Sequence, residues 1–194
     1  MIFRAITVRP PYSAMIAEAE ALATIGVTPK LVENRGRPIH PRHFGTRIAV
    51  HAGKAWSSEG EQDPRVRYAW TQFAKAFDPV AANPLLANHG DTRTGFPNSL
   101  LSIHRSNSLW IPRAAVVATA AIVGCHQAGA CVVEQCHPWG DLTYNGRPAW
   151  HIELVDVHRL TKPVPARGQL AVPWTLPEDV AAAVQAQLDR AGVR

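Results

Sequence analysis

Apolar positions along the chain follow two different periods, and each period predicts its own kind of element. Phe3 to Val8 and Thr46 to His51 have the composition of buried strands. The run from Arg113 to Cys125 is β-branched and continuous, and Trp150 to Val157 alternates like a half-buried strand. Shorter strands are expected at Leu31-Val32 and at 168–172. These segments predict a sheet assembled from distant parts of the chain.

Helical spacing appears in three places. After Pro11, apolar residues recur up to a stop at Gly26, with the set Met15, Ile16, Ala19, Leu22 and Ala23. Residues 55–77 are predicted to be mainly helical, with an apolar face of Tyr68, Ala69, Phe73, Ala76 and Phe77. The last helix has a capping-box start at 175–178, a stripe of Val180, Val184 and Leu188, and a stop at Gly192.

Residues 78–112 have no clear period and are rich in Pro, Asn, Gly, Ser and Thr. They are expected to form a long excursion from the core with short helical turns. Together with the preceding helical stretch, they give an insertion at about 56–112 within a single domain of 1–194.

Composition places the chain among soluble globular proteins. Of its 194 residues 46% are hydrophobic and 18% charged, which suits a real core. Arg4 interrupts the opening apolar residues, and the longest apolar run, Ala114 to Gly124, is too short to span a bilayer. The three cysteines, without a secretory signal, favour a reducing compartment. A cytoplasmic protein without membrane contact is expected, and the oligomeric state stays open.

The positive charge is concentrated in the segment Lys30 to Lys54. This segment holds six of the 20 Lys and Arg residues and one of the 15 acids, so its net charge of +5 equals that of the whole chain. The rest of the chain contains fourteen Lys and Arg residues and fourteen Asp and Glu residues, so it has no net charge. An anionic partner, of which nucleic acid is the commonest, is expected to bind here. A solvated basic loop is the plainer alternative.

Several short motifs occur in an order that resembles a known family. FRAITVRPPYSAMI is followed by LVENRGRP, GTRIAVHAGK, AAVVATAAIVGCH, WHIELVDVHRL and PVPARGQL. In order and spacing they resemble the bacterial branch of the ASCH family, which belongs to the PUA-like superfamily. The resemblance covers most of the chain outside 56–112. Pro10-Pro11-Tyr12 stands where family members often have Gln-Pro-Trp.

The resemblance implies an α+β fold, a PUA-like mixed β-barrel flanked by helices with a cleft beside it. It also implies a role with nucleic acid, because PUA-like domains generally bind RNA or modified bases. Some small ASCH proteins are amidohydrolases acting on N4-acetylcytidine, and others are ribonucleases. The family motif G-x-K-x-x-E-x-R falls on Lys30, Glu33 and Arg35, with Thr28 in place of its Gly. The amidohydrolase branch has Thr where this chain has Glu33.

The candidate site begins with this motif. Glu33 and Asn34 are expected to recognise a base edge, and Lys30 and Glu33 are the catalytic candidates if the protein is an enzyme. An ordinary surface ion pair is the alternative for the Lys30, Glu33 and Arg35 cluster. The remaining nucleic-acid-binding candidates are Arg37, Arg42, Arg47, His51, Lys54 and Trp139. Trp139 is chosen because its turn is expected to expose the indole for stacking.

No metal or other cofactor is expected. Cys125, His126, Cys131, Cys136 and His137 contain no C-x2-C pair, the zinc-deaminase signature is absent, and the resemblance implies no family metal. Reduced structural thiols are the expectation for these residues. No G-x-S-x-G motif supports serine-hydrolase chemistry.

Two functions of different class remain. The favoured one is a binding module for RNA, single-stranded nucleic acid or a modified nucleoside. The second is a hydrolase of the same fold, acting on a modified nucleobase amide or on RNA. Glu33 in place of the Thr of the amidohydrolase branch favours the binder. A protein-interaction module is a weaker third alternative.

Overall fold

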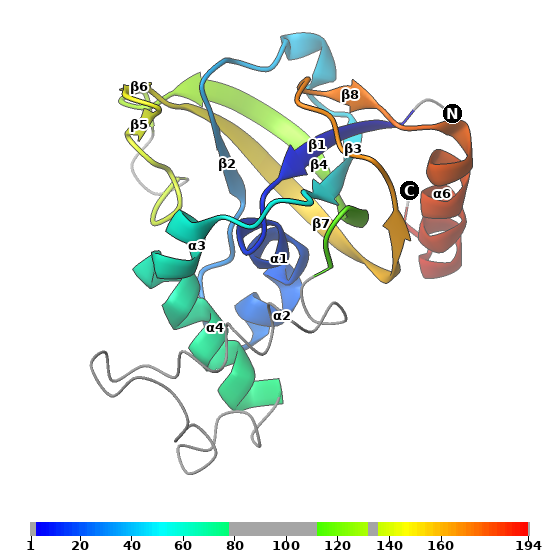
Figure 1. Cartoon of the computed structure of the whole chain (residues 1–194), viewed down its shortest axis with the longest axis horizontal. Helices are drawn as coiled ribbons and strands as arrows, with labels where there is room; N and C mark the ends of the chain where they lie inside the picture. The colour runs from blue at the N-terminus through cyan, green and yellow to red at the C-terminus, as the bar shows by residue number, and fades with distance from the viewer. Residues whose placement is uncertain (1–2, 78–111, 132–135, 194) are drawn as a thin grey trace.

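The computed structural model describes residues 3–77, 112–131 and 136–193, and the predicted excursion at 78–112 therefore lies almost wholly outside the described residues. The fold is α+β, as expected (Figure 1). The main sheet has the order β2-β7-β4-β3-β1-β8. Its strands are β1 (Arg4–Val8), β2 (Val32–Arg35), β3 (Arg47–Ala52), β4 (Ala115–Gln127), β7 (Trp150–Pro165) and β8 (Trp174–Thr175). A small hairpin of β5 (Thr143–Tyr144) and β6 (Arg147–Pro148) stands beside it.

The sheet is mixed and strongly bent. β1 runs parallel to β3, while the pairs β3–β4, β4–β7 and β2–β7 are antiparallel. The pairing of β4 with β7 shifts register at three places, and Asp156 has a φ of 50° within β7. Such bulges bend a strand and increase its twist, which lets these two long strands wrap around a core.

The described strands do not close into the barrel that was expected, because the strand order ends at β2 and β8. The gap between β2 and β1 is bridged by a side chain instead: Nη2 of Arg35 donates to the carbonyl oxygen of Thr7. A guanidinium can satisfy an edge carbonyl where a backbone N–H would do so in a closed barrel.

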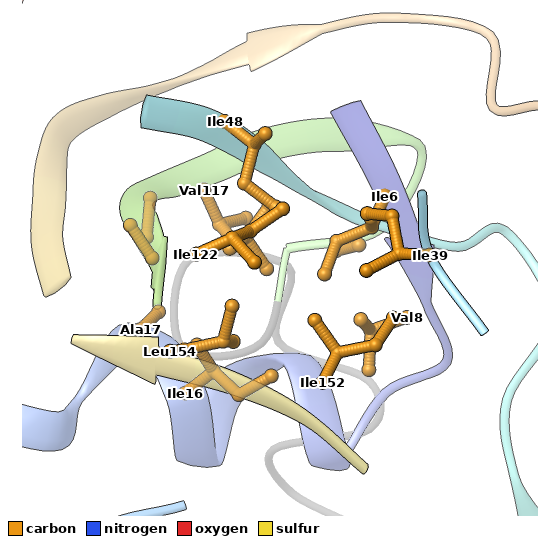
Figure 2. Packing of buried hydrophobic residues seen from close by; sticks show 14 residues of the cluster. Ile6, Val8, Ile16, Ala17, Ile39, Ile48, Val117, Ile122, Ile152 and Leu154 are labelled. Carbon is orange, nitrogen blue, oxygen red and sulfur yellow. The ribbon is translucent and has the colours of Figure 1, made fainter. Parts of the chain in front are cut away.

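The main core lies inside the bend of the sheet. Ile6 and Val8 of β1 face Ile152 and Leu154 of β7, and Ile16 closes one side (Figure 2). Ile16 belongs to α1 (Tyr12–Ala17), which is separated from α2 (Ala19–Thr24) at Glu18. One continuous helix was predicted here. Glu18 leaves the helical conformation, and its buried carboxylate accepts a hydrogen bond from Nη1 of Arg159 at 2.9 Å.

Two further clusters cover the ends of the sheet. α6 (Glu178–Ala191) buries the predicted stripe of Val180, Val184 and Leu188 against Phe3 and Trp174. α3 (Ser58–Gln62) and α4 (Pro64–Phe77) lie on the other side of the molecule (Figure 1). The buried face of α4 is Val66, Ala69, Trp70 and Phe73, at the spacing of one helix face. Tyr68, predicted to belong to this face, is instead 57% exposed.

The remaining differences concern short segments. The helical turn η1 (Pro41–His43) lies in the basic connection between β2 and β3. The strand predicted at 168–172 is absent from the described residues, and β8 begins two residues later, where Trp174 pairs with Ala5. None of the helices that the structure describes is both long and apolar enough to cross a membrane.

Candidate functional site

The predicted cluster of Lys30, Glu33 and Arg35 is present. Glu33 and Arg35 share one face of β2, as strand alternation requires, and Nε of Arg35 lies 3.0 Å from Oε1 of Glu33. Lys30 precedes the strand and folds back onto it. Its Nζ donates to the carbonyl oxygen of Val32 and lies 3.6 Å from Oε2 of Glu33. A carboxylate between two cations is thus held by a single short strand.

Lys30 is almost completely buried, with 2% of its surface exposed. Its Nζ lies 5.6 Å from the ring centroid of Tyr12 and 5.9 Å from that of Trp139, within reach of both aromatic faces. Burial lowers the pKa of Lys30, and the nearby carboxylates of Glu33 and Asp141 oppose this shift only in part. This lysine therefore gives up its proton more readily than an exposed one.

A second charged group surrounds the first and was not predicted. Arg65 pairs with Asp63 at 2.6 Å through Nη2 and with Asp141 at 2.9 Å through Nη1. The hydroxyl of Tyr12 donates to Oδ2 of Asp63 at 2.9 Å. Burial and this hydrogen bond raise the pKa of Tyr12. Burial alone would raise the pKa of Asp63, but the hydrogen bonds from Arg65 and Tyr12 outweigh it, and the pKa is lowered.

One local signal could have placed Asp63. Its Oδ1 accepts a hydrogen bond from the backbone N–H of Arg65 at 2.9 Å, so Asp63 caps the start of α4 with Pro64 behind it. Asp followed by Pro before an apolar-periodic stretch is a helix-start pattern. Nothing in the local sequence indicates that this cap also contacts Tyr12 and lies beside Asp141, 78 residues further on.

Asn34 does not present a free amide for a base edge. Its Nδ2 donates to the carbonyl oxygen of Trp139 at 2.9 Å and to Oδ2 of Asp141 at 2.7 Å. Its Oδ1 accepts from the backbone N–H of Asp141 at 3.1 Å. Asn34 therefore fastens the turn at 136–141 to β2, which is a positioning role.

The expectation that its turn exposes Trp139 is wrong, because the residue is only 3% exposed. Its Nε1 donates to the carbonyl oxygen of Thr28 at 3.0 Å, and Asn34 holds its backbone, so the indole is drawn inward. Its ring nevertheless forms part of the wall of an open pocket of about 320 Å³. The described lining is Val27, Thr28, Pro64, Arg65, Tyr68, Pro138 and Trp139.

Two of the predicted nucleic-acid-binding residues, His51 and Arg47, instead make contacts within the protein. His51 is 1% exposed, lies edge-on to Trp174 at 5.7 Å between ring centroids, and bonds the carbonyl oxygen of Ala166 through Nε2. Burial lowers the pKa of His51. Arg47 pairs with Asp156 and donates to Oγ1 of Thr119 at 3.0 Å. Both residues stabilise the bent sheet and the loop beside it.

Arg37, Arg42 and Lys54 remain exposed on the connections that flank β3. Of the six Lys and Arg residues in the basic segment, Lys30, Arg35 and Arg47 form ion pairs within the protein. Only Arg37, Arg42 and Lys54 present their charge to the solvent. The positive charge that this segment exposes to the solvent is therefore smaller than its net charge of +5, counted from the sequence, indicates.

One group of side chains has the composition of a metal centre, although none was expected. The ligand atoms of His126, Cys131, Cys136 and His151 all lie within 4.8 Å of one another. His151 was absent from the set considered in the sequence. Cys125 belongs to that set but lies on the opposite face of β4, where it packs against the main core.

Comparison with known proteins gives one kind of match. No family model and no curated protein matches the chain. The fold is similar to a solved structure of ASCH from Zymomonas mobilis, with a TM-score of 0.43 and 12% identity over 94% of this chain and 93% of that one. A mutant of the same protein, in which a tyrosine is replaced by phenylalanine, gives 0.43 and 13% over 94% and 96%.

Proposed function

We propose that this protein is a nucleic-acid-binding module that holds an unpaired base, or a modified nucleoside, in the pocket beside Trp139. The observation that carries the proposal is the pocket's composition. Tyr68 offers an exposed aromatic ring, and Val27, Pro64 and Pro138 offer apolar walls. Base stacking on an aromatic side chain needs such a surface and tolerates any base.

The size of the pocket and the planar groups in its wall suit this ligand. A volume of about 320 Å³ accommodates one nucleoside and excludes a duplex. The guanidinium carbon of Arg65 lies 5.5 Å from the ring centroid of Trp139, at the pocket wall. Arg65 would contribute a planar stacking face, while Asp63 and Asp141 balance its charge. Its pairs with Asp63 and Asp141 fix its orientation before a ligand arrives.

The exposed cations would hold the backbone of the strand whose base enters the pocket. Arg37, Arg42 and Lys54 are the candidates because the other Lys and Arg residues of the basic segment form ion pairs within the protein. Contacts of this kind position a nucleic acid without recognising its sequence. The proposed ligand is therefore single-stranded, and the protein's base preference would come from the pocket.

Tyr68→Ala tests the proposal directly. The side chain is exposed, so its removal leaves the core intact, and affinity for a single-stranded oligonucleotide should fall by about 5- to 150-fold, since stacking contributes ~1–3 kcal/mol per base. Tyr144→Ala is the matched control, an exposed tyrosine on β5 outside the described lining of the pocket. Equal affinities of the two variants, measured by fluorescence anisotropy, would refute the proposal.

A hydrolase acting on a modified nucleobase is the second candidate, and one observation favours it. Burial lowers the pKa of Lys30, which is what a lysine acting as a general base requires. Glu33 lies beside it as a partner. Lys30 lies beneath Tyr12 and Trp139, so such an enzyme would have to move one ring to admit its substrate.

A further inference from the structure

We propose that His126, Cys131, Cys136 and His151 bind one zinc ion as a structural centre. The four residues come from three places in the chain. His126 and His151 are directly opposite each other on β4 and β7. Cys131 and Cys136 belong to the connection that leaves β4 and leads to the β5–β6 hairpin. The proposal does not depend on nucleic-acid binding.

The distances between the four ligand atoms match a single coordination sphere. Sγ of Cys131 lies 3.3 Å from Nε2 of His126 and 3.2 Å from Nδ1 of His151. Sγ of Cys136 lies 3.2 Å from Nε2 of His126. Zinc bonds of about 2.3 Å to sulfur and about 2.0 Å to nitrogen place tetrahedral S and N ligands about 3.5 Å apart. The three observed S–N distances are a few tenths of an ångström shorter, and all four ligand atoms lie within 4.8 Å of one another.

Both imidazoles are oriented by acceptors on their far sides. Nδ1 of His126 lies 2.7 Å from Oε1 of Glu153, and Nε2 of His151 lies 2.8 Å from the carbonyl oxygen of Asp141. A carbonyl oxygen can only accept, so Nε2 of His151 carries the hydrogen and Nδ1 keeps its lone pair for the cluster. In His126 the Glu153 carboxylate accepts the hydrogen of Nδ1, so Nε2 keeps its lone pair and faces the two sulfur atoms. Metal-bound histidines nearly always have such outer partners.

Two glycines leave the space that this arrangement needs. A Cβ at Gly140 would lie 2.7 Å from Cβ of Cys136 and 2.8 Å from Cε1 of His151. A Cβ at Gly124 would lie 2.9 Å from Oε1 of Glu153. Larger residues at either position would push a proposed ligand, or the carboxylate that orients one, out of place.

The ligand set selects the metal and its role. Two thiolates and two imidazoles in one tetrahedron are typical of zinc, and four protein ligands leave no open position for a substrate. Binding would release the two thiol protons to solvent, and the two thiolates would neutralise the charge of Zn²⁺. No electron is transferred. A two-iron cluster would need the cysteines and histidines on separate metals, whereas sulfur and nitrogen here are direct neighbours.

The centre would lie directly behind the pocket. Cys136 is followed by the turn that carries Pro138 and Trp139, and the carbonyl that orients His151 belongs to Asp141. A zinc ion would therefore fasten this turn to β4 and β7 from one side, while Asn34 fastens it to β2 from the other. The proposed metal stabilises the wall of the pocket and takes no part in chemistry there.

Metal content of the 194-residue protein, purified without chelators, tests the proposal. Elemental analysis by plasma mass spectrometry should give about one zinc per chain. Cys131→Ser should retain less than about a tenth of it, because a thiolate ligand is lost. Cys125→Ser is the matched control, since Cys125 precedes His126 in the sequence and faces the other side of β4, and it should keep the full content. Glu153→Gln should bind zinc about 10- to 100-fold more weakly.

A measurement on the unaltered protein covers the case in which Cys131→Ser fails to fold. X-ray absorption at the zinc edge should show two sulfur ligands near about 2.3 Å and two nitrogen ligands near about 2.0 Å. Four outcomes would overturn the proposal. They are protein purified without bound metal, a zinc coordination shell that contains no sulfur, full zinc content in Cys131→Ser, and a disulfide joining Cys131 to Cys136. Iron in place of zinc would overturn the assignment of the metal.

Discussion

Single residues in this protein take roles that depend on burial more than on type. Lys30, Glu33 and Arg35 could be singled out from the sequence because they match a motif of the family that the chain resembles, and strand spacing places Glu33 and Arg35 on one face. Their surroundings could not, since Asp63, Arg65 and Asp141 reach the cluster from elements far along the chain. Charge counts in a sequence likewise do not distinguish paired cations, such as Arg47, from exposed ones, such as Arg42.

Lys30 gives a pH-dependent stability whose sign follows from its burial. The pKa of Lys30 is lowered in the folded state, so the unfolded chain binds more protons between that pKa and about 10.4. The free energy of unfolding contributed by this group must rise with pH across this window. Lys30→Met removes the contribution. The stability of the wild type relative to Lys30→Met should therefore increase from neutral to alkaline pH in urea denaturation.

Lys54→Met is the control for this measurement. Lys54 is exposed, so its substitution removes an ammonium without any burial cost. A stability difference for Lys30→Met that stays constant with pH, or that matches the one for Lys54→Met at every pH, would show that Lys30 is not perturbed in solution.

Helices and strands could be predicted from the sequence where a single apolar pattern marks the buried face of the element. β4 and α6 were predicted within a few residues because one is continuously apolar and the other carries a single stripe. β7 continues eight residues beyond the prediction, to Pro165. The second half of β7 is largely exposed, so its sequence has no alternation of apolar and polar residues to predict a strand. Only its backbone pairing with β4 defines it as a strand.

Other elements were missed because distant contacts decide them. Glu18 interrupts the predicted first helix where it pairs with Arg159 of β7. The short strand at Trp174 forms because its backbone pairs with β1, while Nε1 of Trp174 donates to Oγ1 of Thr7 at 3.0 Å. The four-residue thiol and imidazole group was missed for the same reason. His151 is fifteen residues from Cys136 in sequence and adjacent to His126 only through the β4–β7 pairing.

For the whole molecule, the sheet order explains why a basic segment can serve both core and surface. The segment Lys30 to Lys54 contains both β2 and β3. Its side chains Lys30, Arg35 and Arg47 pair with acids or carbonyls of the bent sheet. Outward positions on the flanking connections keep their charge. Any binding of nucleic acid should therefore depend on a few cations, and on salt accordingly.

Replacing Arg37, Arg42 and Lys54 together with Gln should reduce the salt dependence of oligonucleotide binding. Each lost phosphate contact on a single strand removes about 0.7 from the slope of log K against log salt, so the slope should fall by about 2. Affinity should weaken by a similar factor for all sequences, because such contacts do not recognise bases. Titrations at several salt concentrations give the slope.

The control carries the same change in net charge at another place. Lys162, Arg167 and Arg190 are exposed residues on and near β7 and α6, outside the basic segment Lys30 to Lys54. Their joint replacement with Gln should leave the slope nearly unchanged. If both triple variants lower the slope equally, binding responds to overall charge, and the proposed backbone contacts are wrong.

The proposed function requires the pocket beside Trp139 to bind a base without transforming it. The direct measurement is incubation of the protein with a panel of single-stranded oligonucleotides and modified nucleosides, followed by retention and product mass for each compound. At least one compound should be retained with its mass unchanged, and Tyr68→Ala should retain less of it than Tyr144→Ala. Turnover by the wild type that is abolished in Lys30→Ala while binding persists, or the absence of any retention, would contradict it.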